Sequence, residues 1–189
     1  DGRVSAFVEP IALYQTRDLF PGDGARSFPL PPQGEAIDIG EVGVYEPPSP
    51  RASSAPDVVV FTYGNGVPMS LRAARALGSE KVDARVIDLR WIAPLPVEAI
   101  EAHAREARSI LVVDECRHSG NVSEAIAAVV AESSALRGKP FARVTSADSF
   151  IPLAEAANLV LLQEDEIVRA ALALAGPRTS AAAAEARPS

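Results

Sequence analysis

The densest group of chemically reactive side chains in the sequence is Asp114-Glu115-Cys116-Arg117-His118. A cysteine and a histidine close together can act as a nucleophile and its general base. On an extended segment Cys116 and His118 point the same way, but the neighbouring sequence supplies no third group to orient the histidine. A single cysteine is also among the side chains most often buried. The pattern favours a structural Cys116, and a His118 that lies in a loop or an interface beside a carboxylate such as Glu115.

The sequence offers little to a metal ion. It contains two histidines, His103 and His118, whereas zinc and similar ions need clusters of His, Cys and carboxylate side chains at defined spacings. Neither histidine has a partner at such a spacing, and His103 falls in a stretch with helical periodicity. We therefore expect no metal-binding residue in this chain.

The turn Gly64-Asn65-Gly66 is a second place where chemistry could occur, because it follows a predicted strand and precedes a predicted helix. Backbone amides at such a junction can bind a phosphate. The spacing of the glycines matches neither a dinucleotide fingerprint nor a P-loop. Two interpretations remain open: a site for a small anion or nucleotide, or glycines that only permit a tight turn with positive φ.

A stiff loop follows Asp88, where Arg90 and Trp91 precede Pro94 and Pro96. Proline fixes φ and removes a backbone donor, so we expect this loop to be rigid. Tryptophan and arginine are enriched at the centres of protein interfaces. Trp91 therefore either anchors a partner surface or closes an edge of the sheet.

The elements that must position these residues alternate between strands and helices. Four short runs of β-branched and apolar residues predict buried strands, at 58–61, 84–87, 110–113 and 141–144. Between them apolar residues recur at helical spacing, at 67–77, 97–104 and 122–130. Successive strands start 26 to 31 residues apart, enough for a strand, a crossover helix and two loops. The pattern predicts an α/β domain with a mostly parallel sheet and helices on both faces.

Residues at the predicted helix ends support this assignment. Asn121 can cap the third helix, with Glu124 reaching back in a capping box. The last helix is predicted to begin at 164–166, where three acidic residues suit the positive end of the helix dipole. Gly176 followed by Pro177 predicts its end.

Composition excludes several classes of protein. The chain has 189 residues, of which 48% are hydrophobic and 23% charged, and it lacks the run of roughly 20 apolar residues that a membrane span requires. One cysteine cannot form an internal disulfide, so a reducing cytoplasmic location is the simpler inference. The net charge of −7 argues against general binding to nucleic acid. We expect neither a membrane nor a nucleic acid as partner.

The sequence divides into three parts. Residues 1–56 are rich in proline and glycine and are predicted to be mostly connector, with one short strand at 4–8. A single strand cannot bury itself, so 4–8 is predicted to end a preceding domain or to pair with another chain. Residues 57–175 form the α/β domain, and 176–189, made mainly of Ala, Ser, Thr, Arg and Pro, are predicted to be a disordered tail.

Five groups of residues follow one another along the chain: 7–14, 59–64, 86–90 with Pro94 and Leu95, 112–115 with Ser119 and Gly120, and 143–145 with Asp148, Ile151 and Pro152. Taken in this order, they resemble the C-terminal part of the β subunit of thiamine-diphosphate-dependent 2-oxo-acid dehydrogenases. These enzymes are the decarboxylating components of the pyruvate and branched-chain complexes. The resemblance extends to about Ala175.

The resemblance implies a transketolase C-terminal domain: three layers, α/β/α, around a mostly parallel five-stranded sheet with one antiparallel strand. It also implies that 1–56 hold the end of an upstream pyrimidine-binding domain and a linker. In this family thiamine diphosphate and magnesium are held by residues outside this region. We therefore expect no catalytic or cofactor-binding residue here, and no cofactor bound by this fragment alone.

The same resemblance implies partners for this region: the α subunit or an α-like region, a second β copy in a homo-oligomer, and in many members the lipoyl acyltransferase core. The chain runs about 14 residues beyond the last predicted helix, which weakens any docking that needs a free C-terminus there. The candidates for interface contacts are Arg90, Trp91, Glu115, Arg117 and His118.

Two alternative functions remain open. The C-terminal domains of transketolase and of deoxyxylulose-phosphate synthase share this architecture, although residues 9–14 favour the dehydrogenase. A stand-alone module that binds an anion or nucleotide at Gly64-Asn65-Gly66 is an alternative of another class.

Overall fold

A five-stranded sheet forms the middle layer of the protein in this computed structural model, which describes residues 2, 4–47 and 55–176. The strands are β1 (Gly43–Tyr45), β2 (Val58–Thr62), β3 (Ala84–Asp88), β4 (Ser109–Arg117) and β5 (Phe141–Ser146). They lie in the order β1-β3-β2-β4-β5. All neighbouring pairs are parallel except β1 with β3. The four predicted strands are confirmed, and the antiparallel strand implied by the resemblance is β1.

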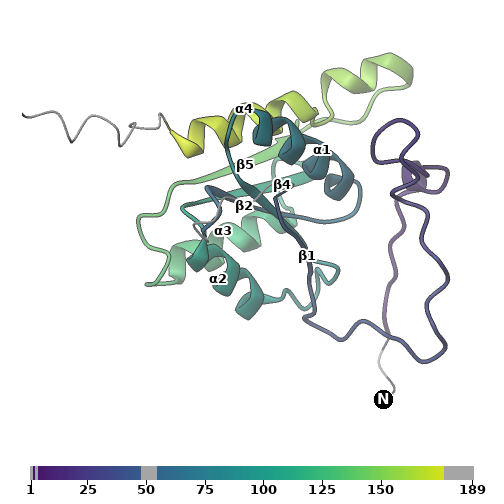
Figure 1. The fold of residues 1–189 in the computed structure, drawn as a ribbon, viewed down its shortest axis with the longest axis horizontal. Coiled ribbons are helices and arrows are strands. Elements are labelled where there is room, and N and C mark those ends of the chain that lie inside the picture. Colours follow the sequence, from purple (N-terminus) through teal and green to yellow (C-terminus); the bar gives the residue numbers. More distant parts are fainter. Residues whose placement is uncertain (1, 3, 48–54, 177–189) are drawn as a thin grey trace, which may run out of the picture.

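Four helices cover the two faces of this sheet. They are α1 (Gly66–Ser79), α2 (Val97–Glu106), α3 (Val122–Glu132) and α4 (Glu164–Ala175). Figure 1 shows α1 and α4 on one face of the sheet and α2 and α3 on the other. Two short 3-10 helices, η1 (Ile11–Leu13) and η2 (Ala154–Leu159), lie outside these layers. The predicted three-layer α/β/α fold is confirmed.

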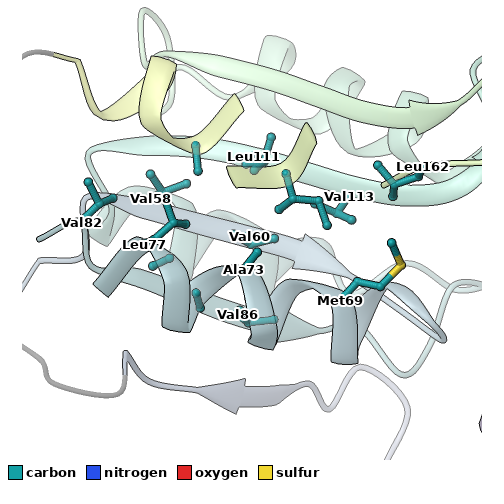
Figure 2. Packing of buried hydrophobic residues seen from close by; sticks show 14 residues of the cluster. Val58, Val60, Met69, Ala73, Leu77, Val82, Val86, Leu111, Val113 and Leu162 are labelled. Atoms are coloured by element: carbon teal, nitrogen blue, oxygen red, sulfur yellow. The ribbon is translucent and has the colours of Figure 1, made fainter. Parts of the chain in front are cut away.

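Alternation along the strands sends side chains into two separate cores. In β2, Val58 and Val60 pack toward α1 and α4, whereas Val59 and Phe61 pack toward α2 and α3. Figure 2 shows the first core, where Met69 and other side chains of α1 meet the valines of the sheet. All five residues of β2 are buried because helices cover both faces of this central strand. This is why the central strands read as continuous apolar runs.

The predicted helix ends are present in the structure. The Asn121 side chain accepts a hydrogen bond from the Glu124 amide at 3.3 Å. In a standard capping box the Glu124 carboxylate would accept a hydrogen bond from the Asn121 amide. Here it accepts from the amide of the preceding residue, Gly120, at 3.1 Å. The α4 helix begins at Glu164 as predicted, and Gly176 follows its last residue with φ of 66°.

The N-terminal region differs from the prediction in one respect. Residues 4–8 form no strand, because nothing in the described part of the chain pairs with them, and Val4, Phe7 and Val8 are exposed. Figure 1 shows this segment running beside the domain, apart from the sheet. Farther along the N-terminal region, the guanidinium of Arg75 from α1 lies over the ring of Phe20, 4.2 Å from the centre of that ring. The predicted tail falls on 177–189, outside the described residues.

Candidate functional site at the carboxyl edge of the sheet

A buried carboxylate in β4 links the residue after β2 to the first turn of α3. Asp114 is 1% exposed and accepts three hydrogen bonds. Its Oδ1 accepts from the Tyr63 hydroxyl at 2.7 Å and from the Cys116 amide at 3.0 Å, and its Oδ2 accepts from the Ser123 amide at 3.0 Å. The Ser123 amide belongs to the first turn of α3, where a negative charge is favourable. Asp114 therefore fixes the start of α3 against the sheet.

Tyr63 and Cys116 lie together but are poorly suited to nucleophilic chemistry. The Tyr63 hydroxyl is 3.5 Å from the Cys116 sulfur. Burial raises the pKa of the Tyr63 phenol above its ordinary value, and its hydrogen bonds to Cys116 and Asp114 raise it further. Cys116 is exposed, so the expectation that a lone cysteine is buried is wrong. Desolvation by the surrounding atoms nevertheless raises the pKa of the Cys116 thiol, against the opposing effect of the Tyr63 hydrogen bond. A thiol that stays protonated is a weak nucleophile, which argues against a catalytic Cys116.

The turn before α1 lacks the free amides that a phosphate site needs. The Gly66 amide donates to the Tyr63 carbonyl at 3.1 Å and the Val67 amide to the Gly64 carbonyl at 3.3 Å, and Pro68 has no amide hydrogen. The Asn65 side chain donates to Glu115 at 2.7 Å, so a carboxylate already lies beside this turn. Gly64 has φ of 56°. The geometry favours the tight-turn interpretation over an anion site.

Gly66 is required for a different reason, because a Cβ there would overlap the Thr62 hydroxyl. We expect Gly66→Ala to lower the free energy of unfolding by about 2 kcal/mol through overpacking. Gly78→Ala is the matched control in the same helix, since a Cβ at Gly78 meets nothing within 4 Å. It should stabilise the protein by about 0.5 kcal/mol.

Urea unfolding of the two variants measures both effects. Thr62→Ala in the Gly66→Ala background should restore part of the loss, because it removes the overlapping hydroxyl. Equal stability of Gly66→Ala and Gly78→Ala would show that this close approach does not constrain the turn.

His118 lies between β4 and β5, but its partners differ from the one predicted. Its Nδ1 is 3.0 Å from the Thr145 hydroxyl, and its Nε2 is 3.3 Å from a guanidinium nitrogen of Arg143. The predicted partner Glu115 instead accepts the hydrogen bond from Asn65. The difference arises because His118 directly follows β4 and lies beside Thr145 of the adjacent strand β5, whereas Glu115 is bound by Asn65 from the turn after β2.

The loop after β4 is also tied to the loop after β5. Ser119 donates to both oxygens of Asp148, through its amide at 2.8 Å and its hydroxyl at 2.6 Å. These two hydrogen bonds hold the pKa of the Asp148 carboxyl below its usual value. Arg117 is exposed and donates from Nε to the Ser119 carbonyl at 3.2 Å.

Arg90 and Trp91 lie away from this group, after β3. The Arg90 guanidinium donates to Glu41 at 2.6 Å, and its backbone amide donates to Asp88 at 3.2 Å. Arg90 thus holds the connector that leads into β1. Trp91 is half-buried. The predicted interface role of Arg90, Trp91, Glu115, Arg117 and His118 stays a prediction.

A cavity of about 340 Å³ opens between the ends of β5 and α4. Its lining includes His118, Thr145, Ser146, Asn158, Leu159, Gln163 and Glu166. Some polar groups of this wall are partnered within the chain: Ser146 donates to the Glu115 carbonyl and accepts from the Leu162 amide, and the Gln163 amide donates to Glu166. These contacts account for Ser146 and the Gln163 backbone amide, and other polar groups of the wall stay exposed to the cavity.

Two further classes of site have no basis in the described part of the chain. Among residues 2, 4–47 and 55–176, no group of three or more His, Cys, Asp or Glu side chains could hold a metal ion. No helix among the same residues has both the length and the apolar composition to cross a membrane.

The sequence named several residues of this group but not their contacts. Asn65 and Arg143 contact partners that are 50 and 25 residues away in the chain, and no motif links them. Tyr63 and Asp114 each follow a predicted strand. The one available signal was that parallel strands bring such ends to the same edge.

Comparison with known proteins places the fold in a family. The family model described as "Transketolase, C-terminal domain" matches residues 50–167, more than half of the chain. The chain belongs to this family. This family assignment agrees with the resemblance found in the sequence and with the three-layer architecture of the structure.

The transketolase C-terminal domain described here is similar to part of longer bacterial proteins. It is 31% identical over 166 residues to the pyruvate dehydrogenase E1 component subunit beta of Staphylococcus aureus, covering 86% of this chain and 47% of that protein. The same subunit of Staphylococcus epidermidis is 30% identical over 168 residues, covering 87% and 48%. The chain thus spans about half the length of these relatives.

Solved structures with the same fold include two enzymes that are more distant in sequence. A split-gene transketolase, described as an inactive beta4 tetramer, has a TM-score of 0.60 at 22% identity, covering 73% of this chain and 42% of the other. A 2-oxoglutarate:ferredoxin oxidoreductase from Magnetococcus marinus has a TM-score of 0.50 at 18% identity, covering 72% and 20%. At these identities the likeness supports the fold of the transketolase C-terminal domain.

Proposed function

We propose that this chain is the C-terminal part of the β subunit, or β-like region, of a thiamine-diphosphate-dependent 2-oxo-acid dehydrogenase. The complete enzyme would oxidatively decarboxylate a 2-oxo acid and pass the acyl group to lipoamide. The observation that carries the proposal is the 31% identity to pyruvate dehydrogenase E1 beta subunits, which extends over 86% of the chain. A match of this extent includes connector sequence as well as the domain.

The role of this part is structural support and subunit assembly. The side chains at the carboxyl edge hydrogen-bond to one another, as in the Asp114 and Asp148 groups. They leave no activated nucleophile, since the pKa of Cys116 is raised. The partners we propose are the α subunit or α-like region, a second β copy, and the lipoyl acyltransferase core of a cytoplasmic multienzyme complex.

The residues described do not fit the cofactor of such an enzyme. Binding the diphosphate of thiamine diphosphate would require free amides or cations, but the amides at the start of α1 are used in the turn. Magnesium would require oxygen ligands gathered in one place, and the described residues offer no such group. We therefore propose that other parts of the complete enzyme bind thiamine diphosphate and magnesium.

The same proposal assigns the ends of the chain. Residues 1–56 would hold the end of an upstream pyrimidine-binding domain and the linker from it, 57–175 the transketolase C-terminal-like domain, and 176–189 a C-terminal tail. The exposure of Val4, Phe7 and Val8 supports the first assignment, because apolar side chains that belong to another domain have nothing to cover them here.

Calorimetric titration tests the absence of a cofactor site. Thiamine diphosphate and magnesium added to this polypeptide should give no heat beyond dilution, because the chain lacks both free amides at α1 and a cluster of oxygen ligands among its described residues. Tight binding would contradict the proposal that the reaction centre is formed elsewhere.

The activity itself is tested on the complete parent protein together with its thiamine-diphosphate-binding partner. Reduction of an artificial electron acceptor should depend on a 2-oxo acid, thiamine diphosphate and magnesium. Comparing pyruvate with branched-chain 2-oxo acids identifies the substrate. Transfer of a two-carbon unit between sugar phosphates, or condensation of pyruvate with glyceraldehyde 3-phosphate, would favour transketolase or deoxyxylulose-phosphate synthase instead.

A further inference from the structure

The N-terminal connector contains one loop that is folded on itself. Residues 17–26, which we call the clamp loop, are closed by a hydrogen bond of 2.9 Å from the amide of the last residue to the carbonyl of the first. Inside the loop the Asp18 carboxylate accepts from the amides of Gly22 at 3.1 Å and Gly24 at 2.8 Å. Both glycines have positive φ, of 79° and 60°, which glycine adopts readily. The clamp loop is therefore an ordered element, although it is neither a helix nor a strand.

A second carboxylate, that of Asp23, holds the other side of the clamp loop. Its Oδ1 accepts from the Leu19 and Ala25 amides, both at 3.0 Å, and its Oδ2 accepts from the Phe20 amide at 3.0 Å. The hydrogen bond from Ala25, together with the two others, holds the pKa of the Asp23 carboxyl below its usual value, and the charge of Arg75 in α1 adds to this effect. Two carboxylates thus hold five backbone amides of the clamp loop by charge-assisted hydrogen bonds, which are the stronger kind.

The clamp loop contacts α1 through Phe20. The guanidinium of Arg75 lies over the Phe20 ring, 4.2 Å from its centre, which is a favourable cation–π geometry. Leu19 and Phe20 also form one wall of a cavity of about 290 Å³, whose other walls include Leu71 of α1. Both loop side chains are half-buried, whereas most residues of the connector are exposed. Figure 1 shows the connector passing the domain on the side of α1.

Arg26, the last residue of the clamp loop, faces a second element of the domain. Burial raises the pKa of the Asp88 carboxyl at the end of β3, and this rise is opposed by the Arg90 amide and by the charges of Arg90 and Arg26. The Arg26 charge therefore lies close enough to Asp88 to favour its ionised form. The clamp loop thus meets both α1 and β3. A loop that already has its shape loses less entropy when it docks.

We propose that the clamp loop fixes the connector to α1 and β3, so that the residues before it leave the domain from one defined point. The contacts that carry this proposal come from within the chain, so the clamp needs no other polypeptide. In the complete protein the clamp loop would then set where the upstream part lies against this domain. That consequence rests on the proposed function. The test needs only the 189-residue polypeptide, so its failure would leave the activity assay of the complete protein unaffected.

Limited digestion with trypsin tests the proposal. Trypsin cleaves after Arg26 only while the clamp loop is open, so the rate of this cleavage measures the fraction of molecules in which the loop is open. Asp18→Asn/Asp23→Asn keeps the shape of both side chains, but it removes their charges and replaces one acceptor oxygen of each by an NH2 group. This variant should be cleaved after Arg26 about tenfold faster than the parent. Mass spectrometry identifies the bond that is cut.

Glu35→Gln/Asp38→Asn is the matched control, because it removes the same charge from exposed residues of the connector outside the clamp loop. Its cleavage after Arg26 should match that of the parent. The circular dichroism and urea midpoint of both variants should also match, since the clamp loop contributes no residue to either core. A parent chain that is cut as fast as a synthetic peptide of residues 14–33 would overturn the proposal. Equal rates for the two double variants would overturn it as well.

A second measurement separates the docking of the clamp loop from its folding. Phe20→Ser/Arg26→Gln weakens both contacts with the domain, while Asp18 and Asp23 keep the amides that they bind. The heteronuclear ¹⁵N NOE of the loop amides reports motion on the picosecond-to-nanosecond timescale. In the parent it should equal that of the β2 amides, and in this variant it should fall. Low values in the parent, or unchanged values in the variant, would show that these contacts do not fix the connector.

Discussion

Val60→Asp should prevent the chain from folding. Val60 is 1% exposed in the central strand β2, where it pairs with Val86 of β3 and Leu111 of β4. The side chains around it are apolar and come from the core that faces α1 and α4. An isolated buried carboxylate costs several kcal/mol, on the order of the whole stability of a domain. Circular dichroism and urea unfolding of the purified variant measure the effect.

Ala76→Glu is the control for this experiment. It adds one carboxylate to the same layer of the molecule, but Ala76 is an exposed residue of α1. Its unfolding should stay within about 0.5 kcal/mol of the parent, as for most surface substitutions. A soluble Val60→Asp variant with a cooperative transition would mean that β2 is not the central strand of the sheet.

Asp114→Ala is expected to cost about 3 kcal/mol of unfolding free energy. The substitution removes the acceptor for the Tyr63 hydroxyl and for the amides of Cys116 and Ser123. Water can reach the half-buried Tyr63, but the Ser123 amide lies in a buried setting, so its lost hydrogen bond carries the desolvation penalty of an unsatisfied donor. The start of α3 should loosen first, and amide hydrogen exchange would locate the change.

Two other variants separate this role from simple loss of charge. Asp148→Ala also removes a carboxylate with two hydrogen bonds at the same edge, but that carboxylate is exposed, so its loss should be much smaller. Tyr63→Phe removes one of the three donors to Asp114, and its effect should lie between the two. If Asp114→Ala unfolds at the same urea concentration as Asp148→Ala, the buried carboxylate is not the link we describe.

The regular elements could be predicted from the sequence because their signals are local. A strand covered on both faces requires a run of apolar residues, as at 58–61, and a helix on one face requires apolar residues at helical spacing, as at 122–130. The strand β1 gave no such signal, since it has three residues and one of them is Gly43. Residues 4–8 show the opposite case: their pattern predicts a strand, but none forms here because no strand of the described chain is available to pair with them.

The contacts at the carboxyl edge could not be predicted in the same way. They depend on which strand ends become neighbours, and the order β3-β2-β4-β5 is set by the crossovers and not by any one segment. His118 shows the consequence: it was expected beside Glu115, three residues away, but lies beside Thr145 of the next strand. The resemblance supplied the fold and the fifth strand, and its segments include Thr145 and Asp148 at this edge, but it did not supply their contacts.

The amides in the first turn of α1 have a consequence for how this protein can change. Open α/β sheets usually gain new ligands at the point where a strand passes into a helix. Here Gly66 and Val67 already donate their amides to the turn itself, so a new phosphate site would first have to dismantle the junction between β2 and α1. A ligand that approached this edge would therefore have to be held by side chains, because the turn offers it no backbone donor from Gly66 or Val67.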